Sequence, residues 1–218
     1  MRVIYLDLND EHKFNLAISE AVQYLKEGKI IIYPTDTIYG MGCDAFCERA
    51  IDKIFSIKGR ENMKPLSILV KDIEEIRKYS FVDSKREKII SALLPGPFTL
   101  ILPEAKNIPK LVTGGKNAIG VRIPDNPITK KLLKSFERPI VSTSVNISGR
   151  EPLSDPFKIV EEFKIKKIRP DLILDCGKIP NARPSVIVDI TRENPQIKRS
   201  EILSVQEVRK LLQKLSAL

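Results

Sequence analysis

Residues 30–40 read Ile-Ile-Ile-Tyr-Pro-Thr-Asp-Thr-Ile-Tyr-Gly, and this stretch decides the fold. Four apolar residues in a row, closed by a proline, predict a short buried strand over residues 30–33. A helix is predicted next, over residues 48–57, because Ile51, Ile54 and Phe55 recur at helical spacing. A buried strand followed by an amphipathic helix is the repeating unit of α/β proteins.

The same alternation of strands and helices continues along the chain, so we predict an α/β fold. No repeat, low-complexity tract or long linker interrupts it. Further strands are predicted over residues 3–6, 66–70, 98–102, 119–123, 140–143, 172–174 and 186–190. Further helices are predicted over residues 85–94, 128–136 and 156–163, together with one that turns Leu16, Ala17, Ala21, Val22 and Leu25 inward. Asp155 is the expected N-cap of the helix at 156–163, with Pro156 in its first turn.

The end of the chain, residues 205–218, predicts an amphipathic helix with Val208, Leu211, Leu212 and Leu215 on one side. We expect this side to pack on the core rather than to meet a partner protein. The full length of 218 residues suits one compact domain. We therefore predict a single domain over residues 1–203, followed by the helix in residues 204–218.

The composition bounds the partners and the location of the protein. The chain carries 37 Lys and Arg against 28 Asp and Glu, a formal net charge of +9. This surplus favours acidic partners such as nucleic acid or polyphosphate, although a solvated lysine-rich surface gives the same charge. Apolar runs are too short to cross a bilayer, and Asp7, Asp10 and Glu11 stand where a signal peptide would be apolar. We therefore expect a cytoplasmic protein that does not enter a membrane.

The cysteines and the histidine give no signal for metal or nucleophile chemistry. Cys43, Cys47, Cys176 and His12 would all have to converge to make a structural zinc site, so no metal site is predicted. A single histidine near the N-terminus also argues against a Cys–His or Ser–His nucleophile pair.

Polar residues follow the strand predicted at 30–33. In an extended segment Thr35, Thr37 and Tyr39 would share one face, where two hydroxyls could hold a small polar ligand; a capped turn is the alternative. The next residues, 40–45, match Gly-x-Gly-x-x-Ala. We reject a dinucleotide site here, since six residues separate the strand from Gly40 and helical periodicity resumes only near residue 48. The sequence also lacks a phosphate-binding loop of the type Gly-x-x-x-x-Gly-Lys-Ser/Thr.

Three cations stand at the ends of predicted elements. Lys58 and Arg60 flank Gly59, where the helix at 48–57 is expected to stop. If the chain turns there, both side chains could leave an exposed helix exit together and clamp phosphates. The alternative is that they complement the negative end of the helix dipole. Arg122 closes an apolar strand before a proline, where it suits either a carboxylate ligand or a structural ion pair.

A polar run over residues 142–149 follows the strand predicted at 140–143. Ser142, Ser144 and Asn146 occupy alternate positions, so an extended chain would place these three polar groups on one face. An asparagine can both donate to a phosphate and accept from a ligand. The run therefore indicates either a ligand site or the polar edge of a sheet.

Seven short words occur in order: Tyr-Pro-Thr-Asp-Thr-x-Tyr-Gly (33–40), Lys-Gly-Arg (58–60), Pro-Leu (65–66), Leu-Pro-Gly-Pro-Phe-Thr (94–99), Val-Arg-x-Pro (121–124), Ser-x-Asn-x-Ser-Gly (144–149) and Pro-Ser-x-x-Val-Asp (184–189). Together they strongly resemble the YrdC/YciO family, over about residues 15–203. The resemblance implies a twisted mixed sheet flanked by helices around a large basic concave groove. It also implies threonylcarbamoyl-AMP synthase activity, in which L-threonine, bicarbonate and ATP give L-threonylcarbamoyladenylate and pyrophosphate.

The resemblance implies roles for individual residues as well. It makes Lys58 and Arg60 the catalytic residues, in contact with the ATP phosphates. Arg122 would hold the threonine carboxylate. The other threonine contacts would be Thr35, Ser142, Ser185 and Lys64, and the other ATP contacts would be Ala118 through its backbone, Ser144, Asn146 and Arg199.

The implied reaction uses Mg²⁺ with ATP and needs no side-chain nucleophile. Its product would serve the N6-threonylcarbamoyladenosine modification of tRNA through a downstream threonylcarbamoyl transferase, and tRNA or double-stranded RNA is a further candidate partner. Three alternatives stay open: a YciO-like protein, since residues 80–83, 142–144 and 154–156 resemble that branch; a non-catalytic RNA-binding protein of the same fold; and an enzyme that makes a carbamoyl-adenylate. The retained Lys-Gly-Arg and Ser-Val-Asn words favour the synthase.

Overall fold

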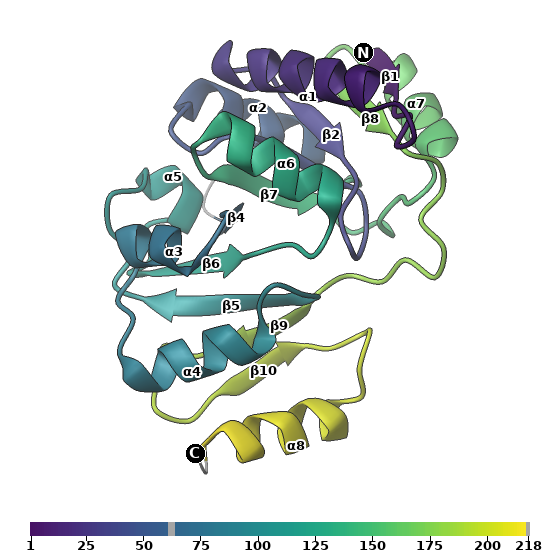
Figure 1. Ribbon diagram of the computed structural model, residues 1–218. Coiled ribbons are helices and arrows are strands. Elements are labelled where there is room, and N and C mark those ends of the chain that lie inside the picture. The colour runs from purple at the N-terminus through teal and green to yellow at the C-terminus, as the bar shows by residue number, and fades with distance from the viewer. Residues whose placement is uncertain (61–63, 217–218) are drawn as a thin grey trace.

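A computed structural model of the chain describes residues 1–60 and 64–216, and within them ten strands form one mixed sheet with helices on both faces (Figure 1). The strand order is β1-β8-β2-β3-β7-β4-β6-β5-β9-β10. The predicted α/β fold with a mixed sheet is therefore confirmed. The strands are β1 Arg2–Tyr5, β2 Ile31–Tyr33, β3 Gly40–Asp44, β4 Ser67–Leu69, β5 Phe98–Pro103, β6 Ala118–Arg122, β7 Ile140–Ser144, β8 Leu172–Asp175, β9 Val186–Asp189 and β10 Gln196–Arg199.

The helices cover the sheet on two sides because the central strands are apolar on both faces. Ile31 and Tyr33 of β2 pack with α1 and α6, whereas Ile30 and Ile32 pack with α2 on the other face. Successive side chains of a strand point to opposite faces, so a run of four apolar residues serves two helix layers at once. The helices are α1 Glu11–Lys26, α2 Glu48–Lys58, α3 Ile73–Tyr79, α4 Ser84–Leu93, α5 Lys110–Thr113, α6 Pro127–Phe136, α7 Pro156–Lys164 and α8 Val205–Ser216.

Short polar side chains begin most of the longer helices. Asp10, Asp83 and Asn126 each accept a hydrogen bond from a backbone N–H in the first turn of α1, α4 and α6. Asp155 caps α7 in the same way, with Pro156 at the first helical position, as predicted. These caps fix where each helix starts, and therefore where the preceding loop ends.

Some predicted features differ from the structure. Leu16 was expected to face inward but is 57% exposed, because the buried stripe of α1 runs through Ala17, Ile18 and Ala21, and Leu16 lies about 100° outside it. Four elements were not predicted. Strand β3 consists largely of residues that were assigned to a loop, and α3, α5 and β10 are short elements with weak periodicity.

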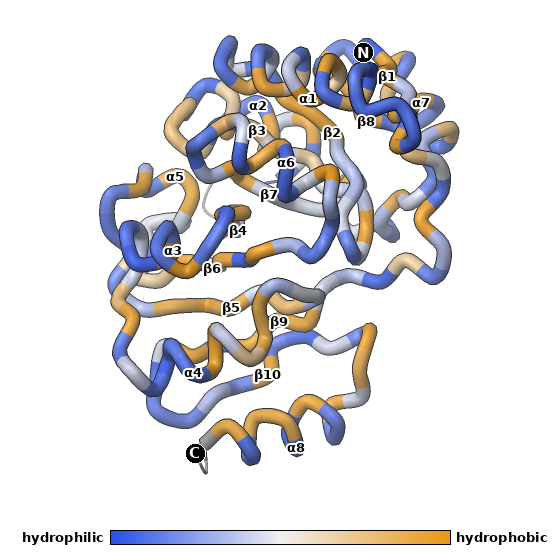
Figure 2. Tube along the Cα trace, viewed as in Figure 1, coloured by the Kyte–Doolittle hydropathy of each residue, from blue (hydrophilic) through white to orange (hydrophobic). Residues whose placement is uncertain are grey.

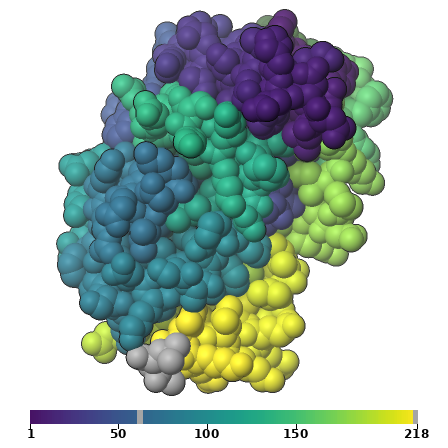
Figure 3. Space-filling view, viewed as in Figure 1, coloured from purple at the N-terminus to yellow at the C-terminus, as the bar shows by residue number. Residues whose placement is uncertain are grey.

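The C-terminal helix α8 packs on the core, as predicted. Val208 and Leu212 are buried in the larger core cluster, with Leu211 and Leu215 packed against it. The helix lies beside α4 and β10, where the yellow end of the chain meets the teal residues in Figure 3. Figure 2 shows apolar and polar residues interleaved along α8, as an amphipathic helix requires. The predicted helix extends to residue 218, beyond the described residues, and the division of the chain at residues 203 and 204 stays a prediction.

No helix in the described ranges has the length and apolar character needed to span a bilayer.

The ring of Tyr33 explains why β3 carries two glycines. Strands β2 and β3 are antiparallel neighbours, with Tyr33 paired to Gly40. A Cβ atom at Gly40 would lie 2.8 Å from Tyr33 Cε2, and one at Gly42 would lie 2.8 Å from Tyr33 Oη and 2.0 Å from the carbonyl oxygen of Val141. The Gly-x-Gly sequence therefore makes room for an aromatic ring and a neighbouring backbone.

This packing predicts a coupling between Tyr33 and Gly40. Gly40→Ala should lower the free energy of unfolding by about 1–3 kcal/mol, because its methyl group overlaps the Tyr33 ring. In a Tyr33→Leu background the same change should cost less than about 1 kcal/mol. Urea unfolding of the two single variants and the double variant measures the difference.

Gly42→Ala is the matched control, since its closest obstacle is the backbone oxygen of Val141. It should stay strongly destabilising in the Tyr33→Leu background, because losing the Tyr33 hydroxyl removes one obstacle but leaves the closer Val141 oxygen in place. If Gly40→Ala costs the same with and without the Tyr33 ring, the ring is not what requires the glycine.

Candidate functional site

A pocket of about 270 Å³ opens over the strands from β3 to β10, which are consecutive in the sheet. Seven of the residues to which the family resemblance gives a role line it: Thr35, Arg60, Arg122, Ser142, Ser144, Ser185 and Arg199. Among the described residues, the polar side chains that line the pocket carry hydroxyls and guanidinium groups, so the pocket suits an anionic ligand. Whether it belongs to a large basic concave groove stays a prediction.

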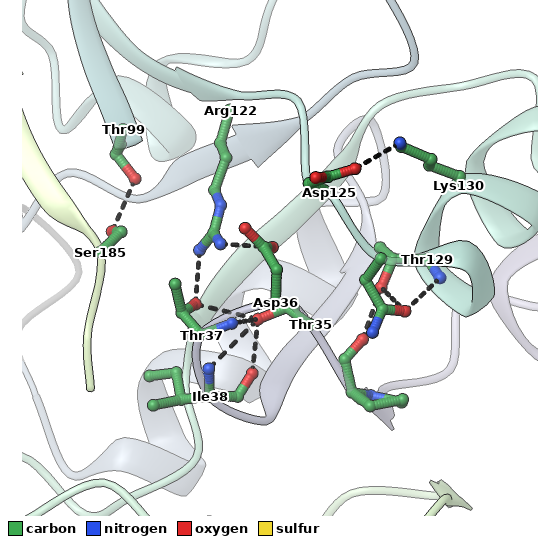
Figure 4. Close-up of polar contacts among 12 residues, drawn as sticks. Thr35, Asp36, Thr37, Ile38, Thr99, Arg122, Asp125, Thr129, Lys130 and Ser185 are labelled. Carbon is green, nitrogen blue, oxygen red and sulfur yellow. Dashed lines mark hydrogen bonds and ion pairs between the residues drawn. The ribbon is translucent and has the colours of Figure 1, made fainter. Parts of the chain in front are cut away.

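Arg122 forms one corner of the pocket, at the end of β6. The residue is only 6% exposed. One terminal nitrogen, Nη2, donates to Asp36 Oδ1 over 2.5 Å, and Nη1 donates to Thr37 Oγ1 over 2.7 Å (Figure 4). Burial lowers the pKa of Arg122 and the Asp36 carboxylate opposes this shift. Nε is buried and has no partner among the described residues, whereas the two bonds leave Nη1 and Nη2 a second proton each for a ligand carboxylate.

The loop between β2 and β3 is a tight hydroxyl-stabilised turn. Thr35 Oγ1 accepts from the backbone N–H of Thr37 and of Ile38 over 3.1 and 3.2 Å, and donates to the Ile38 carbonyl over 2.6 Å (Figure 4). It also lies 3.0 Å from Thr37 Oγ1. The segment is therefore a capped turn, and its two threonines also line the pocket. Whether their hydroxyls hold a ligand stays a prediction.

Tyr39 leaves this face, so the expectation that it would join Thr35 and Thr37 is wrong. Its hydroxyl donates to the carbonyl of Gly177 over 2.9 Å and lies 3.2 Å from Cys176 Sγ. The reason is local, because the turn at residues 35–38 interrupts the two-residue alternation of an extended chain.

Ser185, Arg199 and Thr99 form a second group of polar residues in the pocket lining. Arg199 donates from Nε and Nη2 to the carbonyl of Ser185 over 3.1 and 3.0 Å, and the Ser185 hydroxyl lies 2.9 Å from that of Thr99. Figure 4 shows Thr99 and Ser185 facing each other across the gap between their strands. The pairing of β9 with β10 shifts register between Ile197 and Arg199. Such an irregularity changes the direction of the side chains at this end of β10.

Lys58 is not at an exposed helix exit, and that prediction is wrong. It is 2% exposed and its Nζ donates to Ser144 O over 2.7 Å, Asn146 O over 3.1 Å and Asn146 Oδ1 over 2.8 Å. Burial lowers the pKa of Lys58 to about 7, with a smaller contribution from Arg60. Lys58 and Asn146 thus lie behind the residues that line the pocket rather than among them.

Arg60 separates from Lys58 where the helix stops. Gly59 adopts a left-handed conformation with φ of 59°, which ends α2 as predicted. Arg60 then lines the pocket, donating from Nη2 to the carbonyls of Lys64 and Pro65 over 2.8 and 2.9 Å. Its guanidinium carbon lies 5.4 Å from the centre of the Phe55 ring. The two cations do not form a joint clamp in this conformation.

Lys64 and Ala118 lie outside the pocket lining. The side chain of Lys64 is exposed, and it is the backbone oxygen that serves the site by holding Arg60. Ala118 begins β6, four residues from Arg122, and a strand of that length spans about 13 Å. Their proposed contacts with threonine and ATP stay predictions.

Sequence reasoning gave no site role to Asp36, Thr99 or Ser67. Asp36 and Thr99 stand inside two of the seven words, so the signal was present but unassigned. Ser67 lines the pocket from β4, paired with Ser142 on β7 and Gly120 on β6. Nothing in its local sequence marks it, because only the sheet order brings it to the centre of the site.

The described residues contain no group of three His, Cys, Asp or Glu side chains placed to hold a metal ion. Cys43, Cys47 and Cys176 are free thiols.

A family model matches residues 23–200, which is most of the chain. Its name joins Sua5, YciO and YrdC, and its description is telomere recombination. The chain belongs to the Sua5/YciO/YrdC family. The resemblance found from the seven words is therefore confirmed.

Two archaeal relatives carry the name threonylcarbamoyl-AMP synthase. The chain is 39% identical over 206 residues to a Methanocaldococcus jannaschii protein that bears this name provisionally, covering 93% of each chain. It is 33% identical over 193 residues to the threonylcarbamoyl-AMP synthase of Pyrococcus abyssi, covering 88% of this chain and 56% of the relative. The chain thus spans little more than half of this second relative.

Solved structures of the family superpose closely on the fold. The crystal structure of P. abyssi Sua5 complexed with L-threonine has a TM-score of 0.84 and 30% identity, covering 96% of this chain and 60% of that one. The crystal structure of Escherichia coli YciO has a TM-score of 0.82 and 30% identity, covering 94% and 97%. The fold alone therefore does not separate the synthase from the YciO branch.

Lys58 should give the chain a measurable pH dependence. Its pKa is about 7 in the folded chain against 10.5 for an ordinary lysine, so between these values the unfolded chain binds more protons. The contribution of Lys58 to the free energy of unfolding should therefore rise with pH across this window. Between about pH 6.5 and about pH 9, wild type should gain up to about 2 kcal/mol over Lys58→Met in urea unfolding. An equal difference at both pH values would mean that the buried amine stays charged throughout.

Proposed function

We propose that the chain makes L-threonylcarbamoyladenylate from L-threonine, bicarbonate and ATP, with release of pyrophosphate. The observation that carries the proposal is that three guanidinium groups, those of Arg60, Arg122 and Arg199, line one pocket. A carboxylate and a triphosphate can then bind side by side without competing for one guanidinium. The names of the archaeal relatives and the threonine complex of P. abyssi Sua5 support the choice of substrate.

The amino acid would bind at the Arg122 corner. The remaining protons on the terminal nitrogens can hold its carboxylate, while Asp36 and Thr37 fix the guanidinium plane. The hydroxyls of Thr35, Ser142 and Ser185 line the same pocket and can meet the polar groups of threonine. Arg122 would thus bind the ligand carboxylate while it also forms an ion pair with Asp36. The sequence left these two roles as alternatives, and both would apply.

The reaction would then need positioning and charge rather than a side-chain nucleophile. The amine of threonine and bicarbonate give an N-carboxylate and water. An oxygen of that carboxylate attacks the α-phosphorus of ATP, and the bond to the pyrophosphate oxygen breaks. Arg60 and Arg199 would offset the repulsion between the two anions and the charge that develops on the leaving pyrophosphate.

Mg²⁺ would enter with the triphosphate rather than from a ligand set of the protein. Hydroxyls and guanidinium groups are the polar lining that the pocket offers in the described part of the chain, and they do not fit a protein-held Mg²⁺. The ion would neutralise phosphate charge.

The wider assignment follows from this chemistry. The adenylate would supply a threonylcarbamoyl group to a downstream transferase that acts on tRNA, in the cytoplasm. Direct binding of tRNA or double-stranded RNA stays a prediction from the net charge. The YciO alternative is the nearest rival by fold, and the Lys-Gly-Arg and Ser-Val-Asn words in this chain favour the synthase over it.

The substrate assignment predicts a double requirement. Pyrophosphate release from ATP should need both threonine and bicarbonate, because neither alone provides the attacking carboxylate. Serine lacks the methyl group and should be used at least about 10-fold less well. Incubation with ATP, labelled bicarbonate and a panel of amino acids, followed by chromatography, identifies the adenylate. Equal turnover with serine, or turnover without any amino acid, would exclude threonine as the substrate.

The phosphate assignment predicts a loss of rate without a loss of fold. Arg60→Met and Arg199→Met should each lower kcat/KM by about 10²-fold, since each removes a preorganised charge from the transition state. Lys131→Met is the matched control, because it removes an exposed cation from α6 outside the pocket lining. Rates within about twofold of wild type in both arginine variants would show that the triphosphate binds elsewhere.

A further inference from the structure

The ammonium group of Lys58 is fully engaged within the chain. It offers three protons, and the carbonyl oxygens of Ser144 and Asn146 and the side-chain oxygen of Asn146 each lie within 3.1 Å of Nζ. The backbone of Lys58 takes part as well, because its carbonyl accepts from the N–H of Ser148 over 2.9 Å. Both ends of the residue therefore bind the segment 144–150, which we call the β7 loop.

The orientation of the Asn146 amide is fixed by its partners. Its Nδ2 donates to the carbonyl of Arg150 over 2.5 Å, and its Oδ1 accepts from Lys58. The same Oδ1 also accepts the hydroxyl proton of Ser144 over 2.6 Å. A flipped amide would set a donor against an ammonium and an acceptor against a carbonyl, so this arrangement is the one that satisfies every group.

This network decides which face Ser144 offers to a ligand. Because its proton points to Asn146, the hydroxyl oxygen presents lone pairs to the pocket that it lines. A phosphate near neutral pH brings oxygen acceptors, which do not pair with lone pairs, whereas the ribose and the adenine of ATP carry donors. Ser144 therefore suits the nucleoside part of the nucleotide.

We propose that Lys58 is a positioning residue, which acts on ATP by holding the β7 loop so that Ser144 faces the nucleoside, and does not contact the phosphates. The inference rests on the proposed use of ATP. It differs from the role implied by the family resemblance, in which Lys58 and Arg60 share the triphosphate. Two observations favour positioning over phosphate contact. Lys58 is buried and is absent from the pocket lining, and all three protons of its ammonium group have acceptors within the chain.

The first test needs no nucleotide. Lys58→Gln removes the charge and at least one of the three hydrogen bonds, and Lys53→Gln is the control on the same helix, where Lys53 binds Asp171 instead. Amide hydrogen exchange in the β7 loop should be at least about 5-fold faster in Lys58→Gln than in wild type, with the rest of the sheet unchanged. Lys53→Gln should leave the loop at the wild-type rate. Unchanged exchange in Lys58→Gln would overturn the proposal.

The second test separates positioning from phosphate contact. Dissociation constants for AMP, ADP and ATP are measured by calorimetry for wild type, Lys58→Gln and Lys53→Gln. If Lys58 acts through the loop, Lys58→Gln should weaken all three nucleotides by the same factor. A loss that grows with each added phosphate would overturn the proposal, because it would place the lysine at the phosphates.

Asn146→Ala gives the same test from the other side of the contact, should Lys58→Gln fail to fold. It should also weaken the three nucleotides equally, and the double variant should bind no more weakly than the weaker single one. If wild type binds none of the three, the proposed function fails together with the nucleotide half of this inference. The exchange measurement still decides whether Lys58 holds the β7 loop.

Discussion

Two buried cations, Lys58 and Arg122, impose the constraint on which this site depends. Moving a charge out of water costs several kcal/mol unless oxygen acceptors replace the lost hydration. The chain supplies different oxygen acceptors to Lys58 and to Arg122. Arg122 has a carboxylate, Asp36, and a threonine hydroxyl, whereas the partners of Lys58 within residues 1–60 and 64–216 are two backbone carbonyls and one amide oxygen, with no counter-ion among them. An ion pair cancels the charge of Arg122, while neutral oxygens only solvate that of Lys58. The pKa of Lys58 accordingly falls to about 7.

Meeting these demands ties distant parts of the chain together. Asp36 and Thr37 belong to the turn between β2 and β3, so the ion pair joins that turn to the end of β6 across several strands of the sheet. Lys58 joins the end of α2 to the loop after β7. The glycines of β3 contribute indirectly, because they let the Tyr33 ring lie over the strand that pairs with β7. Each contact that solvates a cation thus also positions a wall of the pocket.

The sequence predicted the strands of the sheet well, but it predicted the directions of the side chains at the ends of elements and in the loops poorly. Strands such as β2 and β6 are short apolar runs, and burial on both faces leaves a plain signal. Lys58 could have been placed correctly, since it stands four residues after Ile54 and seven after Ile51, on the buried stripe of α2. The departure of Tyr39 from the face of Thr35 could not, because it depends on hydroxyl bonds within the turn. The role of Ser67 was equally hidden, since it follows from the order of strands that are distant in the sequence.

The size of the pocket bears on how two substrates would share it. About 270 Å³ falls slightly below the range of roughly 300–1,000 Å³ that is typical of small-molecule sites. ATP and an amino acid together would more than fill it, so in this conformation the enclosed space suits the reacting groups, and the adenosine must extend over the rim. Ser144 lines the pocket at the end of β7, with its hydroxyl proton directed to Asn146. Arg122 is buried at the end of β6 with its acceptors already in place. Under the proposed function, a fold shared by Sua5 and YciO proteins would support the synthase chemistry only where a carboxylate site and a nucleoside site are both formed. In this chain Arg122 would form the first, and Lys58 would position Ser144 for the second.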